Sequence, residues 1–83
     1  MAKPAKDIEK EVIQILAEKL DLDVEKIKPE SKLMEDLGMD SFMSVEFTFE
    51  LKEKFDIDIS PEEFSNVKKV EDVTKKIASK ETK

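Results

Sequence analysis

A periodic run of apolar residues predicts a helix near the start of the chain. The pattern begins at Asp7 and continues for about four helical turns. Its apolar members recur at steps of three or four residues, so an α-helix would place them on one face: Ile8, Val12, Ile15, Leu16 and Leu20.

Residues 21–40 lack that period and predict a long first loop. Pro29 blocks a helix there, because its ring removes a backbone donor and restricts the residue before it. Ser31 is positioned to cap one short turn. Four apolar side chains are expected to pack the loop against the core: Val24, Ile27, Leu33 and Leu37.

Residues 41–55 carry two conflicting signals. From Val45 to Lys52 apolar and polar side chains alternate, which slightly favours a strand on the pattern alone. The whole stretch is longer than a typical strand, contains no Gly or Pro, and places Glu50 four residues before Lys54, as helices do. The pattern by itself leaves helix and strand open.

The last third of the chain predicts two helices. Ser60, Pro61 and Glu63 form a strong start signal, with a serine cap, a proline in the first turn and a glutamate that reaches back. A short helix should follow. A last helix is expected over about residues 70–79, with a poorly capped start at Lys69. Its apolar stripe comprises Val67, Val70, Val73 and Ile77.

Composition limits the function classes. The chain has 83 residues, 39% of them apolar, enough for one small domain, expected at residues 7–79 between tails at 1–6 and 80–83. It has no Cys and no His, so Ser-His and Cys-His nucleophiles are unavailable and an enzyme is not expected. Because no apolar run is long enough for a signal or membrane segment, the sequence is interpreted as a complete cytoplasmic protein.

The net charge limits the classes of partner that the protein can bind. The formal net charge of −6 and the pI near 4.7 argue against nucleic acid and favour basic protein surfaces. Residues 30–58 hold nine carboxylates against three lysines, whereas residues 66–83 hold six lysines against three carboxylates. Two acidic stretches resemble calcium loops, but Lys26 and Pro61 stand where the turn glycine belongs, so no metal site is predicted.

Candidate chemistry centres on the only glycine in the chain. Gly38 can adopt a positive φ and so form a sharp loop ahead of the next element. Asp40 is a good helix cap, and Ser41 then falls in the first turn. An anion on the Ser41 hydroxyl would lie in the favourable field of a helix N-terminus. Most Asp-Ser pairs of this kind are only caps.

The motif Asp36-Leu37-Gly38-Met39-Asp40-Ser41, with Val45-Glu46 and the segment 53–59 after it, resembles the acyl carrier proteins. The similarity runs from about Ile8 to Ile77. It implies an all-α fold, a small four-helix bundle of three longer helices and one short helix with a long first loop. It also decides residues 41–55 in favour of a helix.

The resemblance further implies a function. In that family the motif serine, here Ser41, carries a 4′-phosphopantetheine arm derived from coenzyme A, and Gly38 and Asp40 complete the predicted attachment site. The arm holds acyl groups as thioesters for fatty-acid, polyketide or lipid biosynthesis. Implied partners are a phosphopantetheinyl transferase, acyltransferases and ketosynthases with basic patches. The carrier itself is expected to be a monomer. The alternatives are an aminoacyl or peptidyl carrier and an unmodified acidic adaptor.

The expected docking face follows from a helix wheel for residues 41–55. Two apolar stripes emerge, with carboxylates between them. Phe42 and Met43 depart from the family pattern, and Met43 is expected to give partners an apolar contact in place of an acidic one. All five Phe side chains lie on the helices that would enclose an acyl chain and are interpreted as core packing, with the alternative that they narrow or reshape the cavity. The predicted partner-binding residues are Asp36, Asp40, Met43, Glu46, Glu50 and Glu53.

Overall fold

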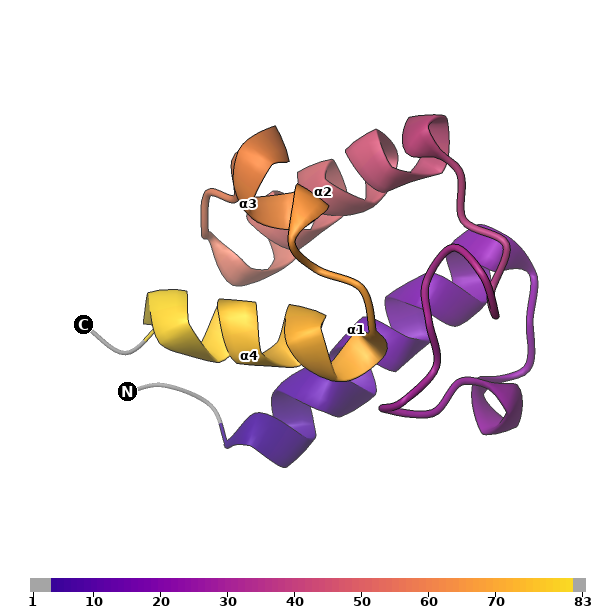
Figure 1. The fold of residues 1–83 in the computed structure, drawn as a ribbon. Coiled ribbons are helices and arrows are strands. Elements are labelled where there is room, and N and C mark those ends of the chain that lie inside the picture. The colour runs from indigo at the N-terminus through magenta and orange to yellow at the C-terminus, as the bar shows by residue number, and fades with distance from the viewer. Residues whose placement is uncertain (1–3, 82–83) are drawn as a thin grey trace.

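The computed structural model describes residues 4–81 as a bundle of helices (Figure 1). Within these residues the only β-structure is one isolated antiparallel bridge between Lys32 and Lys69. The predicted all-α bundle with a long first loop is therefore confirmed. Its elements are α1 (Ala5–Leu20), the 3-10 turn η1 (Val24–Lys26), α2 (Ser41–Phe55), α3 (Pro61–Ser65) and α4 (Val70–Glu81).

The terminal helices are slightly longer than the sequence pattern predicted. The first, α1, begins at Ala5, and α4 continues through Lys80 to Glu81, residues that the pattern assigned to the tails. The remainder of each predicted tail, residues 1–3 and 82–83, lies outside the described part of the chain.

The core forms where α1 packs against α4 and α2 (Figure 1). The predicted apolar stripe of α1 faces inward, with Ile8, Val12 and Leu16 fully buried. On α4, the side chains of Val70, Val73 and Ile77 are also fully buried, as their spacing predicts. Burial of these two stripes, together with Phe47 and Leu51 of α2, removes apolar surface from water and so stabilises the bundle.

Both long helices before α3 end without a glycine. Asp21 follows α1 with φ 57°, and Asp56 follows α2 with φ 54°, both in the left-handed region. The Asp21 N–H donates to the Ala17 carbonyl and so closes the last turn of α1. Aspartate is one of the few non-glycine residues that enter this conformation readily.

The first loop packs by fewer side chains than expected. Ile27 and Leu33 are buried, and Leu37 is partly buried against the core, but Val24 is exposed, so its predicted burial is wrong. Val24 opens the single turn of η1, whereas Ile27 already has an extended backbone, so the two side chains diverge. Ser31 does not cap a following turn either, because its Oγ accepts the N–H of Lys28, earlier in the chain, at 3.0 Å.

Residues 41–55 form a helix, so the strand signal of the alternating pattern was misleading. Asp40 caps α2, with Oδ1 accepting the Met43 N–H at 2.8 Å. Phe47, Leu51 and Phe55 face the core. Phe42 and Phe49 face outward, because at 100° per residue they lie on the opposite side of the helix. The expectation that all five Phe pack in the core is wrong for these two.

The start of α3 matches its sequence signal. Ser60 Oγ accepts the Glu63 N–H at 3.2 Å, and Glu63 Oε2 accepts the Ser60 N–H at 3.0 Å, forming the predicted capping box. Lys80 of α4 also contacts Glu63, at 3.0 Å, and so links the last two helices. The pKa of Glu63 is lowered, first by the Ser60 N–H and then by Lys80.

The start of α4 is better satisfied than the sequence suggested. The Val70 and Glu71 N–H groups donate to the carbonyls of Ser31 and Pro29, at 3.0 and 2.9 Å. The expectation of a poorly capped start is therefore wrong, because the first loop supplies distant carbonyls for these N–H groups and Asp72 Oδ2 accepts the N–H groups of Lys68 and Lys69. In return the Leu33 N–H donates to the Lys68 carbonyl at 2.9 Å, which fixes the loop against the segment before α4.

Candidate functional site

Ser41 is the first residue of α2 and is exposed to solvent. Its hydroxyl makes no hydrogen bond within the described residues, because Asp40 supplies the cap. In the same part of the chain the backbone N–H groups of Ser41 and Phe42 are also without partners. Two free donors and the positive end of the helix dipole therefore surround the hydroxyl, a setting that favours an attached anion.

The loop before Ser41 is closed by its own backbone. Gly38 has φ +75°, as predicted for the turn glycine, and its N–H donates to the Met34 carbonyl at 3.2 Å. The next N–H, that of Met39, donates to the Leu33 carbonyl at 3.0 Å, and the Met39 side chain is buried. These contacts anchor the loop to the core and so fix the direction in which α2 begins.

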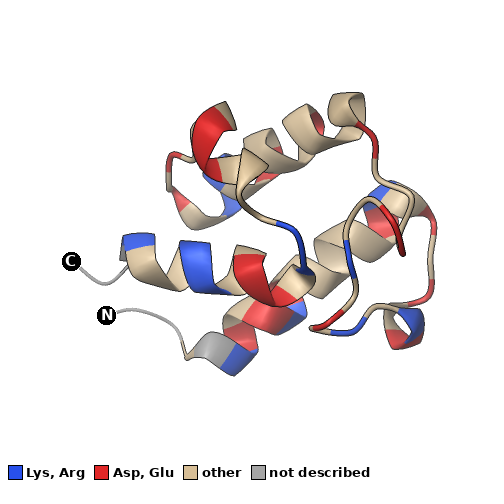
Figure 2. Cartoon of the chain, viewed as in Figure 1, with Lys and Arg blue, Asp and Glu red and all other residues tan. Residues whose placement is uncertain are grey.

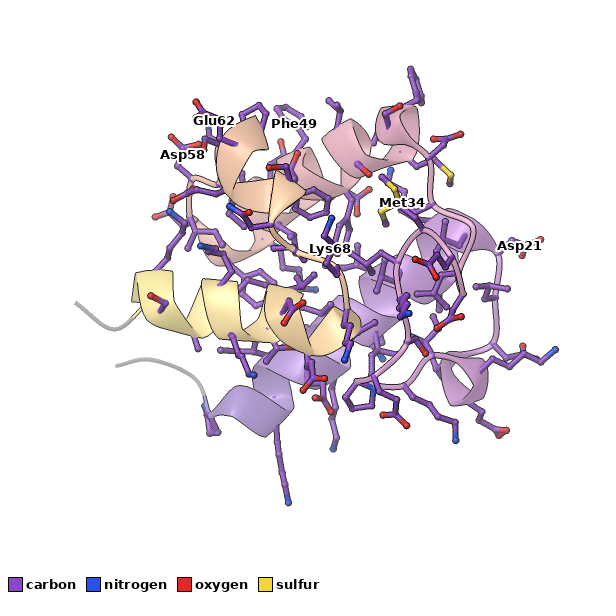
Figure 3. The ribbon with its side chains drawn as sticks, viewed as in Figure 1. Asp21, Met34, Phe49, Asp58, Glu62 and Lys68 are labelled. Carbon is purple, nitrogen blue, oxygen red and sulfur yellow. The ribbon has the colours of Figure 1, made fainter. Side chains whose placement is uncertain are left out.

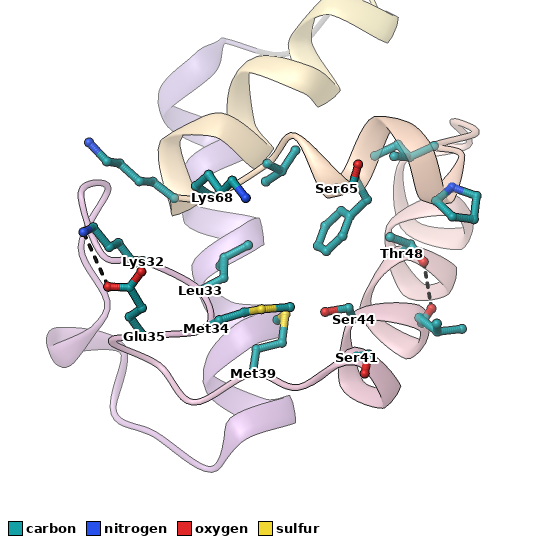
Figure 4. Close-up of a pocket in the computed structure, with 16 residues that line it drawn as sticks. Lys32, Leu33, Met34, Glu35, Met39, Ser41, Ser44, Thr48, Ser65 and Lys68 are labelled. Atoms are coloured by element: carbon teal, nitrogen blue, oxygen red, sulfur yellow. Dashed lines mark hydrogen bonds and ion pairs between the residues drawn. The ribbon is translucent and has the colours of Figure 1, made fainter.

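A cavity of about 630 Å³ opens beside Ser41 (Figure 4). Its walls come from the loop at residues 32–39, from α2, from α3 and from residues 67–69. In Figure 4, Met34 and Met39 extend into the space toward Ser44. The volume lies within the range of about 300–1,000 Å³ typical of small-molecule pockets.

The polar side chains on the cavity walls are largely satisfied within the helices. Ser44 Oγ donates to the Asp40 carbonyl at 2.9 Å, and Thr48 Oγ1 donates to the Val45 carbonyl at 2.8 Å. Since their protons are already bonded, these hydroxyls cost little beside an alkyl chain. The cavity can therefore hold an apolar group that enters next to Ser41.

Phe64 limits the cavity on the α3 side. Its ring lines the space and meets the buried Phe47 ring edge-on, with centroids 6.0 Å apart and planes at 68°. This geometry is a favourable aromatic pair, so Phe64 is held in place. A smaller residue here would extend the cavity toward Phe47.

The six predicted partner-binding residues do not form one free acidic strip. Asp36, Asp40, Glu46 and Glu53 are exposed, whereas Glu50 and Met43 are half-buried. The Met43 side chain packs against the core. Figure 2 shows acidic residues on α3 and in the loop before α2, and lysines along α4 and the segment before it.

Lys19 of α1 pairs with two of these carboxylates. Its Nζ lies 2.8 Å from Glu50 Oε1 and 3.9 Å from Glu46 Oε1. The hydrogen bond to Glu50 raises the pKa of Lys19, although burial acts in the opposite direction. The acidic flank of α2 is therefore partly neutralised within the molecule.

Sequence reasoning missed Lys19 and most of the cavity wall. Lys19 lies more than 25 residues before its partners, and the cavity lining is drawn from four separate segments. No local periodicity or motif links such residues. Only the packing of the helices brings them together.

Comparison with known proteins agrees with this geometry. Residues 10–77 match the family model described as the phosphopantetheine attachment site. The chain is 39% identical over 67 residues to an acyl carrier protein from Rickettsia bellii (strain RML369-C), covering 81% of this chain and 78% of the relative. An acyl carrier protein from Helicobacter hepaticus is 44% identical over 59 residues, covering 71% of this chain and 78% of the relative.

The chain belongs to the acyl carrier protein family. Its fold also resembles a solution structure of a candidate acyl carrier protein from Anaplasma phagocytophilum, with a TM-score of 0.84 and 27% identity over 99% of this chain and 94% of that one. An acyl carrier protein from Enterococcus faecalis has the same fold, with a TM-score of 0.80 at 23% identity, over 94% of this chain and 99% of that one.

Family membership defines the general role. The protein is a carrier and not an enzyme, its cofactor is 4′-phosphopantetheine, and its partners are biosynthetic enzymes. No helix within residues 4–81 is long and apolar enough to cross a membrane.

Proposed function

We propose that Ser41 is the residue to which the 4′-phosphopantetheine arm is attached. The observation that carries this proposal is the exposed, unbonded Ser41 hydroxyl at the start of α2, beside a cavity, inside the segment that matches the attachment family. Asp40 caps the helix in its place, so Ser41 is free for chemistry. Gly38 supports the site by allowing the turn that aims α2.

The modification is a phosphoryl transfer at Ser41. The Ser41 Oγ bonds to the phosphorus next to the pantetheine of coenzyme A, the bond from that phosphorus to 3′,5′-ADP breaks, and the hydroxyl proton passes to a base of the transferase. The chain contains no His to act as that base. The free N–H groups of Ser41 and Phe42 stabilise the resulting phosphodiester charge. The bound arm supplies a thiol that forms thioesters with acyl groups.

The cavity suits the cargo. Leu33, Met39 and Phe64 give it apolar walls next to Ser41, so an acyl chain on the arm can fold back and be shielded from water. The carrier would then present the chain to fatty-acid, polyketide or lipid enzymes in the cytoplasm. An aminoacyl or peptidyl cargo is more polar than an acyl chain, so burial against these apolar walls would stabilise it less.

The proposed partners are enzymes with basic patches on their surfaces. The carrier binds them as a monomer. A phosphopantetheinyl transferase, acyltransferases and ketosynthases would approach the start of α2. Net negative charge would attract them at long range and speed association. The proposed contact residues are Asp36, Asp40, Met43, Glu46, Glu50 and Glu53.

Intact mass spectrometry tests this function. The chain is incubated with coenzyme A, Mg²⁺ and a bacterial phosphopantetheinyl transferase, and we expect the mass to rise by one phosphopantetheine. An unmodified adaptor would gain no mass, which would contradict the proposal. The Ser65→Ala variant, which removes another exposed hydroxyl of the cavity lining, serves as a control and should be modified like the wild type.

A further inference from the structure

Lysines line one end of the cavity that opens beside Ser41. The lining includes Lys32, Lys68 and Lys69, together with the carboxylate of Glu35. In Figure 4, Lys32 and Lys68 lie on the side of the cavity opposite Ser41. An excess of positive charge therefore stands at the end of the cavity that is remote from the proposed attachment site. We call Lys32, Lys68 and Lys69 the distal lysines.

Lys68 is the distal lysine that is free to bind an anion. Lys32 Nζ lies 3.6 Å from Glu35 Oε2, so this lysine already has a carboxylate partner. The Lys69 N–H, and to a smaller extent the Lys69 charge, lower the pKa of Asp72, so the field of this lysine is partly directed at that carboxylate. The Lys68 ammonium makes no ion pair or hydrogen bond within the described part of the chain, and the residue is exposed.

The wall between Ser41 and the distal lysines is apolar. The buried side chains of Leu33 and Met39 line this part of the cavity, and Met34 extends beside them (Figure 4). In Figure 3, Lys68 and Met34 are seen near the centre of the view, whereas the carboxylates of α3 and the segment before it lie at the upper left. A group that extends from Ser41 toward Lys68 must therefore cross apolar surface before it meets a charge.

Positive charge at this end of the cavity runs against the charge of the whole chain. The formal net charge is −6, which by itself repels an anionic cargo. Residues 66–83 nonetheless hold six lysines against three carboxylates, and Figure 2 shows lysines in the segment before α4. Because charges at a surface are screened over about 10 Å, the nearby lysines outweigh the distant carboxylates for a group inside the cavity.

We propose that the acyl cargo of this carrier ends in a carboxylate, as an ω-carboxyacyl group does, and that Lys68 binds this far carboxylate. The proposal rests on the proposed function of Ser41, because the arm attached there delivers the cargo to the cavity. A chain that ends in a methyl group would bring only hydrocarbon to the distal lysines. A carboxylate at that end accepts hydrogen bonds from the Lys68 ammonium and pairs with its charge. The apolar wall and the cation together therefore select an ω-carboxyacyl chain.

Loading the carrier with two matched cargoes tests the proposal. A transferase that accepts acyl-coenzyme A thioesters attaches an arm carrying either octanedioyl or octanoyl, and intact mass verifies each product. We measure how much each cargo raises Tm above that of the chain with an unacylated arm. In Lys68→Gln, we expect the rise from octanedioyl to be smaller than in the wild type by about 2–5 °C, since an exposed ion pair contributes modestly. The rise from octanoyl should be unchanged.

Two control variants and one spectroscopic measurement sharpen the test. Lys68→Arg keeps a cation and should retain the rise from octanedioyl. Lys10→Gln removes the same charge from an exposed lysine of α1 outside the cavity lining, and it should leave both rises unchanged. A ¹³C label on the far carboxylate reports on the wild type directly. Its pKa should be lower on the carrier than in free octanedioyl-pantetheine, because a nearby cation favours the charged form.

The outcomes separate this proposal from the proposed function of Ser41. If the wild type gains no mass, that function fails and this proposal fails with it. If the wild type is loaded but the rise from octanedioyl is the same in Lys68→Gln, only this proposal is overturned. An equal loss in Lys68→Gln and Lys10→Gln would also overturn it, since net charge alone would then account for the effect. So would a carboxylate pKa that is not lowered on the wild-type carrier, because the chain would then end out of reach of Lys68.

Discussion

Asp72 offers the sharpest test of how the cavity wall is held. Its Oδ2 accepts the backbone N–H groups of Lys68 and Lys69, both at 3.1 Å. The Lys68 carbonyl in turn accepts the Leu33 N–H, so one carboxylate fixes the segment that closes the cavity on this side. Asp72→Ala removes both hydrogen bonds and leaves the backbone donors to water.

The cost follows from the type of contact. Loss of a helix-capping side chain costs about 0.5–2 kcal/mol. Asp72 accepts two N–H groups, which favours the upper end of this range of costs. It is only half-buried, however, so competition from water and screening reduce the energy lost with its hydrogen bonds. We expect the free energy of unfolding to fall by about 1–2 kcal/mol. In a domain of this size that lowers Tm by roughly 5–15 °C.

The pH dependence has a definite sign. The pKa of Asp72 is lowered, first by the Lys69 N–H and also by the Lys68 N–H and the charge of Lys75, against the opposing effect of burial. A group with a lowered folded pKa stabilises the fold above its unfolded value, here 3.8, and loses that contribution as pH falls through the folded value. The wild-type advantage over Asp72→Ala should therefore be full at pH 7 and shrink below about pH 4.

Urea unfolding followed by circular dichroism measures this difference at several pH values. Glu71→Ala is the matched control, because it removes the same charge from the same helical turn and Glu71 makes no side-chain hydrogen bond in the described structure. It should cost less than about 0.5 kcal/mol. An equal loss in both variants, or a loss from Asp72→Ala that is constant from pH 7 to about pH 3, would refute the role of the carboxylate.

Three further predictions concern the site. Gly38→Ala should lower the free energy of unfolding, measured in urea, by about 1 kcal/mol. The cause is the φ of +75°, since an added Cβ would meet nothing within 4 Å. An unchanged free energy of unfolding would refute this reason. Phe64→Ala should lower the free energy of unfolding by about 1–3 kcal/mol, because it removes the ring that packs on Phe47, and it should deepen the cavity. In this variant, octanoyl loading should therefore raise Tm more than butanoyl loading does. An equal rise would contradict the prediction. Salt should raise Tm of the wild type, because nine carboxylates crowd residues 30–58; insensitivity from millimolar salt upward would argue against this.

Local sequence signals predicted most of the fold. The capping box at Ser60 and the spacing of apolar residues in α1 and α4 involve neighbours in the chain, so they could be identified without the structure. Asp40 and Gly38 were likewise recognisable from their intrinsic preferences.

The misleading signal in α2 has a physical origin. Phe47 and Leu51 are apolar because they face the core, whereas Val45 and Phe49 are apolar on the outer face. Together they alternate with polar residues at a period of two, which imitates a strand. These exposed apolar residues of α2 are therefore what obscured the helix in the sequence.

Long-range contacts account for the remaining errors. The start of α4 is satisfied by carbonyls of Pro29 and Ser31, about 40 residues earlier in the chain. Lys19 meets Glu50 across two helices. Such pairings depend on the packing of the bundle, so no capping rule or charge count in the sequence reveals them.

Site-resolved mass spectrometry of the modified chain tests the central claim most directly. Trypsin cleaves after Lys32 and Lys52, so one peptide, 33–52, contains Ser41, Ser44 and Thr48. After reaction with coenzyme A and the transferase, we predict that fragments including Ser41 carry the phosphopantetheine and that fragments with only Ser44 and Thr48 do not. Ser41→Ala should keep the wild-type Tm within a few degrees and gain no mass, since Asp40 remains the cap. Modification of Ser44, or of the Ser41→Ala variant, would contradict the account.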